Sequence, residues 1–260
     1  MPGTRRSALI ASAAAAAFAA PSSHASPRIQ SASPANLLVI TATTGYRHDS
    51  ISAAVAALQR LAEETAAYSL TLLPEAADLA ALTPELLSHH HAVCFLNTSG
   101  ELPLDDLQKT ALLSFVHNGG GFFGAHAATD TFYTWPEYAD LVGAHVREHP
   151  WTQPVTITVD DPAHPTTHLL PPSFELEDEI YVFRTNPRSR PNTHILLSLD
   201  PISVGLPPTA APDLPLAWTS TYGAGRVLYN ALGHFGAVWK HPHVTTHLRH
   251  ALPWLTGQSA

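Results

Sequence analysis

The chain has 260 residues, of which 45% are hydrophobic, and this is enough to bury the core of one large domain or two small ones. Its 13 Lys and Arg residues stand against 21 Asp and Glu residues, giving a formal net charge of -8 with no basic stripe, so the composition argues against nucleic acid as a partner. The single cysteine, Cys94, excludes an intramolecular disulfide and lies in an apolar run typical of a buried strand.

Residues 1–25 have the pattern of a targeting peptide. Arg5 and Arg6 precede an apolar run of about 14 residues, and small residues near Ala25 offer a cleavage site. We expect export after cleavage, by a secretory or twin-arginine signal, with an organellar leader as the alternative. The run is shorter than the ~20 residues that cross a bilayer, so no membrane span is expected. A Ser/Pro/Ala linker over residues 26–35 and a single domain over residues 36–257 complete the expected organisation.

Strand and helix patterns alternate along the first half of the domain. Residues 36–43 form an apolar run rich in β-branched side chains, which is typical of a strand covered on both faces. Apolar residues then recur at helical spacing over residues 51–66, where Asp49 or Ser50 can cap the helix. Further strands are expected at residues 68–73, 91–97 and 121–126, with a helix within residues 103–121 and a helical or irregular stretch over residues 74–90.

The second half supplies additional strands. They are expected at residues 153–161, 174–183, 193–199 and 214–232, and the last of these contains a glycine-rich turn that would pair two strands. Residues 241–255 form the final predicted helix. The expected fold class is therefore α/β, with a doubly wound, mostly parallel sheet and extra strands in the C-terminal half.

The loops after the parallel strands are the expected ligand site, because ligands bind outside the carboxyl ends of the strands in such sheets. Three candidate residues lie in these loops: His48, Asn97 and His126. Arg47 directly precedes His48. The stretch GFFGAHAATD bends out of a strand and offers His126 and Asp130, and its glycines indicate close backbone approach. Histidine cannot act as a serine- or cysteine-type nucleophile, but it can be an acid, a base or a metal ligand. The structural alternative is that Asp130 or Thr129 caps a helix while His126 forms a hydrogen bond inward.

The stretch FELEDEIYVF, residues 174–183, is rich in carboxylates. Alternation places Glu175 and Glu177 on a solvated face. Glu179 stands at an apparent break between two strand-like segments, next to Ile180 and close to Tyr181, and could serve as a base or a ligand there, or be an ordinary strand residue.

With 17 histidines in the chain, no single one is strong evidence for a site. The tract at residues 89–91 is expected to be solvated rather than metal-binding. His149 and His234 follow or end predicted elements and are retained as candidates. The weakest candidates lie in loops or on the last helix: His164, His194, His243, His247 and His250. No standard zinc, nucleophile-elbow or dinucleotide motif occurs in its required context.

Several motifs occur in order between about Asn36 and Gly257, among them TTGYRHDSI, GGGFFGAHAATDTFYTWPEYADLVGAHVREHPW and PLAWTSTYGAGRVLYNALGH. Together they resemble the ThuA-like family, named for trehalose utilisation. The resemblance implies a flavodoxin-like three-layer sandwich, similar to class I glutamine amidotransferases but without their cysteine. One departure is Phe235, where an acidic or polar residue is common, so no polar role is expected there. The resemblance assigns family pocket positions to His48, His126, Asp130, His149, Glu179 and His234.

The resemblance also implies carbohydrate metabolism, in particular the breakdown of disaccharides through 3-keto sugars. A 3-ketone acidifies the proton on C2, so a lyase or isomerase needs a base and a group that stabilises the enolate oxygen. The leading hypothesis is an enzyme of lyase, isomerase or hydrolase type acting on a keto-sugar or glycoside. Its expected catalytic residues are His126, Glu179 and Asp130, and its expected substrate-binding residues are His48, Arg47, Asn97, His149, Tyr181 and His234.

Two alternatives stay open. The same residues could hold a divalent metal such as Zn²⁺ for hydrolysis, with His126, His149 and His234 as candidate ligands. The chain could instead be a non-catalytic, degenerate amidotransferase-like domain that binds a sugar or a protein. The expected partner is a small-molecule carbohydrate, with neither nucleic acid nor membrane, and a homo-oligomer is possible.

Overall fold

The computed structural model describes residues 1, 3, 34–207 and 212–258, and the described residues from 34 onward form one compact unit. The predicted targeting peptide and most of the predicted linker lie outside the described residues. The first strand begins at Ala35, inside the stretch predicted as linker. Among the described helices, none combines the length and the apolar character that crossing a lipid bilayer requires.

The first half is a parallel α/β unit, as predicted. Strands β1, β3 and β4 are apolar and almost completely buried, because helices cover both of their faces. Buried Cys94 in β3 packs there as a small apolar side chain. The elements of this half are β1 (Ala35–Ile40), α1 (Ile51–Thr65), β2 (Tyr68–Leu73), the 3-10 helix η1 (Ala76–Ala81), α2 (Pro84–Ser88), β3 (Ala92–Leu96), α3 (Asp106–His117) and β4 (Gly121–Ala125).

The second half adds five strands to the same sheet. They are β5 (Val146–Val159), β6 (Ser173–Phe183), β7 (His194–Leu199), β8 (Pro215–Tyr222) and β9 (Gly225–Asn230), and the sheet order is β2-β1-β3-β4-β9-β8-β7-β5-β6. The first five positions are parallel and have the 2-1-3-4-5 order of a flavodoxin-like fold, with β9 as the fifth strand. From β9 to β6 every pair is antiparallel, so the extra strands extend the sheet rather than forming a separate one.

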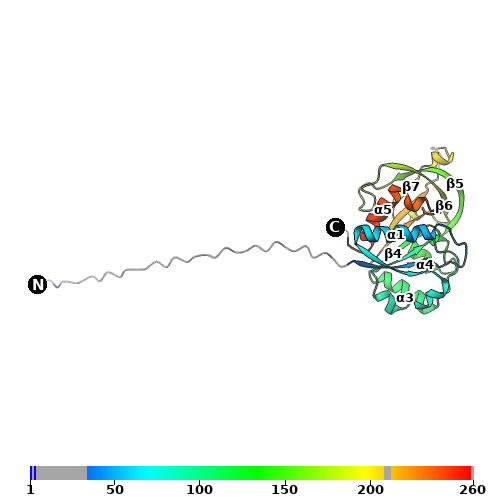
Figure 1. Cartoon of the computed structure of the whole chain (residues 1–260). Helices are drawn as coiled ribbons and strands as arrows, with labels where there is room; N and C mark the ends of the chain where they lie inside the picture. The colour runs from blue at the N-terminus through cyan, green and yellow to red at the C-terminus, as the bar shows by residue number, and fades with distance from the viewer. Residues whose placement is uncertain (2, 4–33, 208–211, 259–260) are drawn as a thin grey trace. The chain divides into compact units, whose positions relative to one another are not determined.

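Helices cover both faces of the parallel part. In Figure 1, α1 and α5 (Pro242–Leu255) lie on one side of β4, and α3 and α4 (Pro136–Val142) lie on the other. The antiparallel part of the sheet is curved, since Phe183 of the edge strand β6 packs against Trp218 of β8 and Tyr229 of β9, with ring centroids 5.0 and 5.8 Å apart. This curvature brings the edge strand β6 to the loops that follow β4 and β9.

Some local predictions were wrong. Strand β6 runs without a break, so Glu179 lies within a continuous strand. Strand β5 begins at Val146 rather than at residue 153, and its register shifts twice between Val146 and Trp151, which hides the alternation in the sequence. Helix α1 has Ser50 at its N-cap, but the Ser50 hydroxyl makes no cap bond and donates instead to the carbonyl of Gly233 (2.8 Å).

His247 of α5 supplies a stability prediction. It is completely buried and its Nδ1 donates to the carbonyl of Thr166 (3.0 Å), and burial lowers its pKa to about 4. The imidazole takes up a proton near pH 6.5 in the unfolded chain but not in the folded chain. The free energy of unfolding therefore falls as the pH drops from 6.5 to about 4, and His247 contributes up to about 3 kcal/mol to this fall. Urea unfolding of wild type and His247→Phe at pH 7 and pH 4.5 measures this loss of stability.

The substitution His247→Phe is expected to lower stability at pH 7, where the bond to Thr166 is lost, and to reduce the difference in stability between the two pH values. The control is His89→Ala, because the His89 side chain is 70% exposed. A pH dependence of His247→Phe equal to that of wild type would contradict the assignment.

Candidate functional site

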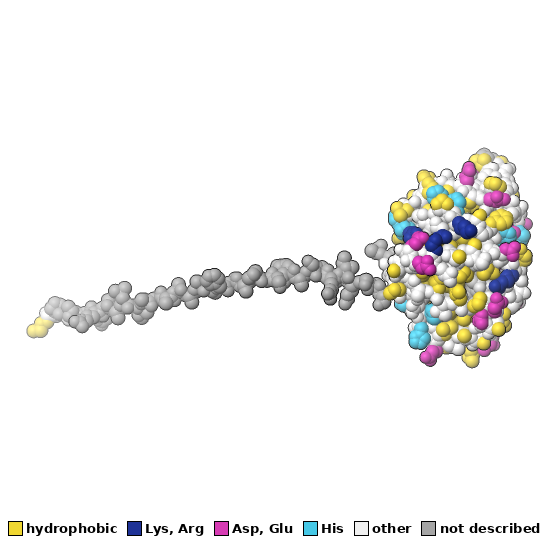
Figure 2. Space-filling view, viewed as in Figure 1, with side chains coloured by type: hydrophobic (Ala, Val, Ile, Leu, Met, Phe, Trp, Pro, Cys, Tyr) yellow, Lys and Arg dark blue, Asp and Glu magenta, His cyan; other side chains and the backbone are white. Residues whose placement is uncertain are grey.

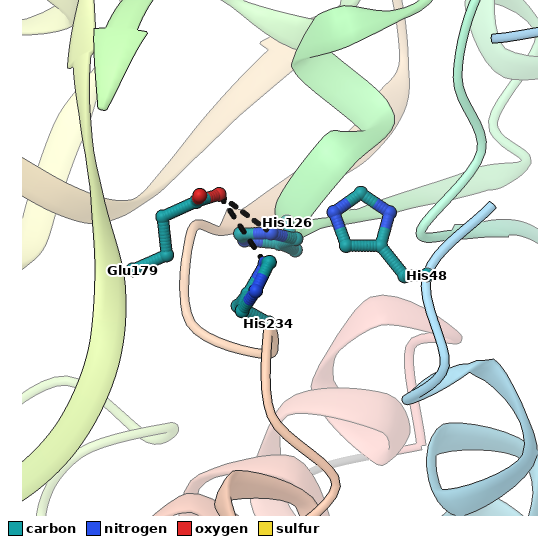
Figure 3. A group of neighbouring side chains, drawn as sticks. All are labelled: His48, His126, Glu179 and His234. Carbon is teal, nitrogen blue, oxygen red and sulfur yellow. Dashed lines mark ion pairs between the residues drawn. The ribbon is translucent and has the colours of Figure 1, made fainter. Parts of the chain in front are cut away.

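The site lies at the carboxyl ends of the parallel strands, where the topology predicted it. His48 follows β1, His126 follows β4, His234 follows β9, and Glu179 reaches the same place from β6. The rings of His48 and His126 have centroids 4.8 Å apart, and those of His48 and His234 are 5.3 Å apart. Figure 3 shows His126 and His234 between Glu179 on one side and His48 on the other.

His126 sits on a strained corner. It has a positive φ of 45°, which a residue with a side chain adopts only at a cost of about 1 kcal/mol or more. Its Nδ1 lies 2.7 Å from the carbonyl oxygen of Ala231, which can only accept, so Nδ1 carries a proton and Nε2 is the free coordinating or basic nitrogen. The hydroxyl of Tyr181 is 3.1 Å from that Nε2, and the two rings stack 4.4 Å apart. His126 has no exposed surface.

Buried Asp178 fixes the loop that carries His234. Its Oδ2 accepts from the backbone N–H of Gly233 (2.7 Å), and its Oδ1 accepts from those of His234 (3.0 Å) and Phe235 (3.4 Å). Burial raises the pKa of Asp178, partly opposed by these backbone bonds. Gly233 has φ 142°, and a Cβ there would lie 2.8 Å from the Trp239 ring, so the loop requires glycine at this point.

Asn97 lies beneath the site rather than in it. Its side-chain amide donates to the Ser50 hydroxyl (2.9 Å) and to the Gly233 carbonyl (3.0 Å), and the residue is fully buried with φ 51°. It therefore connects the loops after β1, β3 and β9. The expected substrate-binding role of Asn97 does not agree with this inward direction.

Glu179 is the centre of the cluster. Its Oε2 lies 3.6 Å from His126 Nε2 and 3.3 Å from His234 Nδ1, and its Oε1 lies 3.0 Å from His149 Nδ1. One ligand atom from each of four residues falls within 4.8 Å of all the others, which is the only such metal-ligand grouping among the described residues: His48, His126, Glu179 and His234. His149 belongs to this network through Glu179, but not to the four-residue grouping that could share one ion.

The charges of the cluster are set by burial and by mutual contact. Burial, together with the positive charge of neighbouring histidines, lowers the pKa of His48 to about 3, so its imidazole is neutral. Burial alone would raise the pKa of Glu179, but its contacts with His126 and His234 outweigh burial and hold it well below the usual value, so the carboxylate stays ionised. The contact with Glu179 raises the pKa of His234. His48 Nδ1 is buried and has no hydrogen-bond partner.

A pocket of about 800 Å³ opens above the cluster, within the size range of small-molecule sites. Six of the predicted residues line it: His48, Asp130, His149, Glu179, Tyr181 and His234. Arg47 does not line it, because its guanidinium turns to Glu75 (3.3 Å) and to the Thr41 carbonyl. The direction of the Arg47 side chain therefore does not agree with its expected substrate-binding role.

The structural alternative, a helix cap at Asp130 or Thr129 and an inward hydrogen bond from His126, is found only for His126. Asp130 is half-buried on the pocket wall, and its Oδ1 accepts from the Tyr133 hydroxyl (2.8 Å). The next helix, α4, has Trp135 at its N-cap and no side-chain cap bond, so neither Asp130 nor Thr129 caps it. His126 does bond inward, but its Nε2 still faces Glu179.

Sequence reasoning missed Asp178 and Tyr133. Alternation in β6 places Asp178 on the buried face, and a carboxylate at a buried strand position indicates a specific partner. That signal was present in the sequence. Tyr133 carries no comparable signal, because its role depends on the path of the loop after β4.

Other features of the described surface differ from this site. A cavity of about 790 Å³ between α2 and α3 lies at the amino ends of β3 and β4, and its lining includes the apolar residues Leu87, Leu107 and Phe115. On the face drawn in Figure 2, Lys and Arg side chains are interspersed with acidic ones.

The fold is shared with solved structures of low sequence identity. A ThuA-like protein from Bacteroides uniformis is 24% identical, with a TM-score of 0.72, and the match covers 88% of this chain and 95% of that one. A ThuA-like protein from Parabacteroides merdae is 20% identical, with a TM-score of 0.67 over 86% of this chain and 90% of that one. A β-galactosidase from Rahnella sp. matches at 12% identity and a TM-score of 0.54, over 85% of this chain and 31% of that one.

No curated protein matches the chain. The family model described as trehalose utilisation, ThuA, matches residues 36–255, which include every residue of the cluster. The chain therefore belongs to the ThuA family, whose description indicates a carbohydrate-related role.

Proposed function

We propose that the chain is an enzyme of carbohydrate metabolism that acts on a keto-sugar or glycoside, removing a proton from the carbon next to a ketone with the help of a divalent cation. One observation carries the proposal: three imidazoles and an ionised carboxylate converge within 4.8 Å at the floor of an open pocket of about 800 Å³. The family supports the substrate class.

The four residues of the cluster, His48, His126, Glu179 and His234, fit a divalent cation. Three nitrogens and one oxygen are a donor set that Zn²⁺ and similar ions accept. His126 is already oriented, because the Ala231 carbonyl holds its Nδ1 proton and leaves Nε2 unprotonated. His48 is neutral, so one of its ring nitrogens has a lone pair for a metal. A cation bound there would stabilise the negative charge that develops on a ketone oxygen.

The proton acceptor must be a different group. His126 has no surface in the pocket, and the low pKa of Glu179 makes its carboxylate a weak base. One of these two residues was expected to be the base, and the geometry favours a ligand role for each. Two carboxylates line the pocket outside the cluster, Asp130 and Glu148. Glu148 pairs with Arg147 (2.6 Å), whereas the Tyr133 hydroxyl fixes the direction of Asp130 (2.8 Å). We assign proton removal to Asp130.

The test follows deuterium at C2 of a 3-keto-disaccharide in D₂O. Wild type loaded with Zn²⁺ or Mn²⁺ is expected to exchange or eliminate at C2 and to leave the unoxidised disaccharide unchanged, because only the ketone acidifies that proton. Removal of the metal with a chelator is expected to abolish the reaction, and elemental analysis of the loaded protein should approach one ion per chain.

The matched variants for this test are His126→Ala, which removes one ligand, and His89→Ala, which changes an exposed histidine outside the pocket. Only the first should lose metal. Metal content well below one ion that His126→Ala leaves unchanged would overturn the cation site. Hydrolysis of the glycoside with its original C2 hydrogen retained would replace the proposal by the hydrolase alternative, and binding without any reaction would replace it by the sugar-binding alternative.

A further inference from the structure

Two of the four cluster residues come from loops that are far apart in the sequence. His48 lies in the loop before α1, and His234 lies in the loop after β9 (Figure 3). Their rings meet edge to face, with centroids 5.3 Å apart. Beside this contact, residues of both loops line a space of about 160 Å³. Because side chains do not fill this space, packing there cannot set the separation of the two loops.

Ser50 does not have the role that its place at the start of α1 predicts. A serine at a helix N-cap normally accepts a hydrogen bond from a backbone N–H of the first turn. Ser50 occupies the N-cap of α1, but its side chain accepts no such bond. Its hydroxyl donates instead to the carbonyl of Gly233, 183 positions away and directly before His234 (2.8 Å). A local rule that is broken in favour of a distant partner indicates a constraint from the site rather than from the helix.

The bond from Ser50 belongs to a closed set of buried hydrogen bonds. The side-chain amide of Asn97 donates one hydrogen to the Ser50 hydroxyl (2.9 Å) and the other to the Gly233 carbonyl (3.0 Å). The indole N–H of Trp239 donates to the same carbonyl (3.0 Å). Ser50 and Asn97 are at most 2% exposed, so water does not compete for these bonds.

We propose that Ser50 is a positioning residue, which holds the loops of His48 and His234 at the separation at which both imidazoles reach one ligand. For the identity of that ligand, a divalent cation, this rests on the proposed function. The connection to His48 is short, because the N–H of Ile51 donates to the His48 carbonyl (3.2 Å). The connection to His234 is a single peptide bond, since the carbonyl that accepts from Ser50 is that of Gly233.

The variants separate this bridge from ordinary stability. Ser50→Ala removes the bridge and no helix cap bond, because the Ser50 side chain makes none. Ser50→Thr keeps the hydroxyl, and its added methyl group has room in the space of about 160 Å³ that Ser50 lines. The control is Thr83→Ala at the N-cap of α2, where the Thr83 hydroxyl accepts from the N–H of Leu86 (3.2 Å). It removes a real cap bond outside the site.

Two measurements are made on each protein. In the metal-free protein, Ser50→Ala should make amide hydrogen exchange about tenfold faster at Ile51 and His234, whose N–H groups are hydrogen-bonded within the two loops. In competition with a metal indicator, Ser50→Ala should bind Zn²⁺ about tenfold more weakly. Ser50→Thr should match wild type in both measurements. Thr83→Ala should lower the urea midpoint and also match wild type in both.

The positioning role is overturned if Ser50→Ala keeps wild-type exchange rates, or keeps wild-type Zn²⁺ affinity where wild type binds the ion. Equal changes in Thr83→Ala would also overturn it, because they would reflect a general loss of stability. The outcome is separable from that of the proposed function. If wild type binds no Zn²⁺ but Ser50→Ala alone frees both loops, the positioning role stands and the cation site fails. If wild type binds Zn²⁺ and Ser50→Ala changes nothing, the reverse holds.

Discussion

Replacing Asp130 by Asn is expected to lower the rate of exchange at C2 by about 10²- to 10⁴-fold while bound metal stays near one ion per chain. The reason is that Asn keeps the size of Asp and can still accept from Tyr133, but it cannot take up a proton, and a positioned base contributes this much to a rate. Replacing Glu179 by Gln should lower the rate at least as far and should also lower the metal content, because the ionised ligand is lost.

Elemental analysis and the D₂O assay on the same samples separate the two roles. The control is Glu148→Gln, which changes another carboxylate of the pocket wall, 53% exposed and paired with neighbouring Arg147 (2.6 Å). It should keep both metal and activity. A fully active Asp130→Asn would show that the base lies elsewhere in the pocket, and a metal-free Asp130→Asn would show that Asp130 belongs to the ligand set.

Replacing Asp178 by Ala is expected to cost about 2 kcal/mol or more in stability and to weaken metal binding by roughly 10- to 100-fold. Three backbone N–H groups of the loop after β9 would lose their acceptor, and His234 would no longer be held toward Glu179. Urea unfolding and competition with a metal indicator measure the two effects.

Two further variants serve for comparison with Asp178→Ala. Asp178→Asn keeps one acceptor oxygen and should fall between wild type and the alanine variant. Glu177→Ala changes the preceding, exposed residue of the same strand and should leave both quantities unchanged. Wild-type metal affinity in a folded Asp178→Ala protein would rule out the positioning role of Asp178.

The sequence predicted the parallel half of the fold and the edge of the sheet at which the site lies. Buried runs such as residues 36–43 identify strands covered on both faces, and the crevice rule then brings the loops of His48 and His126 together. The family resemblance extended this to His149, Glu179 and His234, and in the structure both histidines contact Glu179. The periodicity of β6 alone could not place Glu179 in the site, because the position of β6 depends on how the sheet curves.

The directions of individual side chains could not be predicted in the same way. Asn97 follows a buried strand with nearly the same φ as His126, 51° against 45°, but its amide bonds to the Ser50 hydroxyl under the loops. Arg47 is adjacent to His48, but its guanidinium bonds to Glu75. Such differences depend on partners far away in the sequence, which leave no periodic pattern.

The position of β9 in the sheet has a consequence for how the chain is made. Strand β9 pairs with β4, although β5, β6, β7 and β8 all lie between them in the sequence. During synthesis the apolar edge of β4 must therefore stay unpaired until residues 225–230 have emerged, and an open edge of this kind invites pairing with other chains. A truncated product that ends before β9 is expected to aggregate and to hold no metal, since His234 follows the same strand.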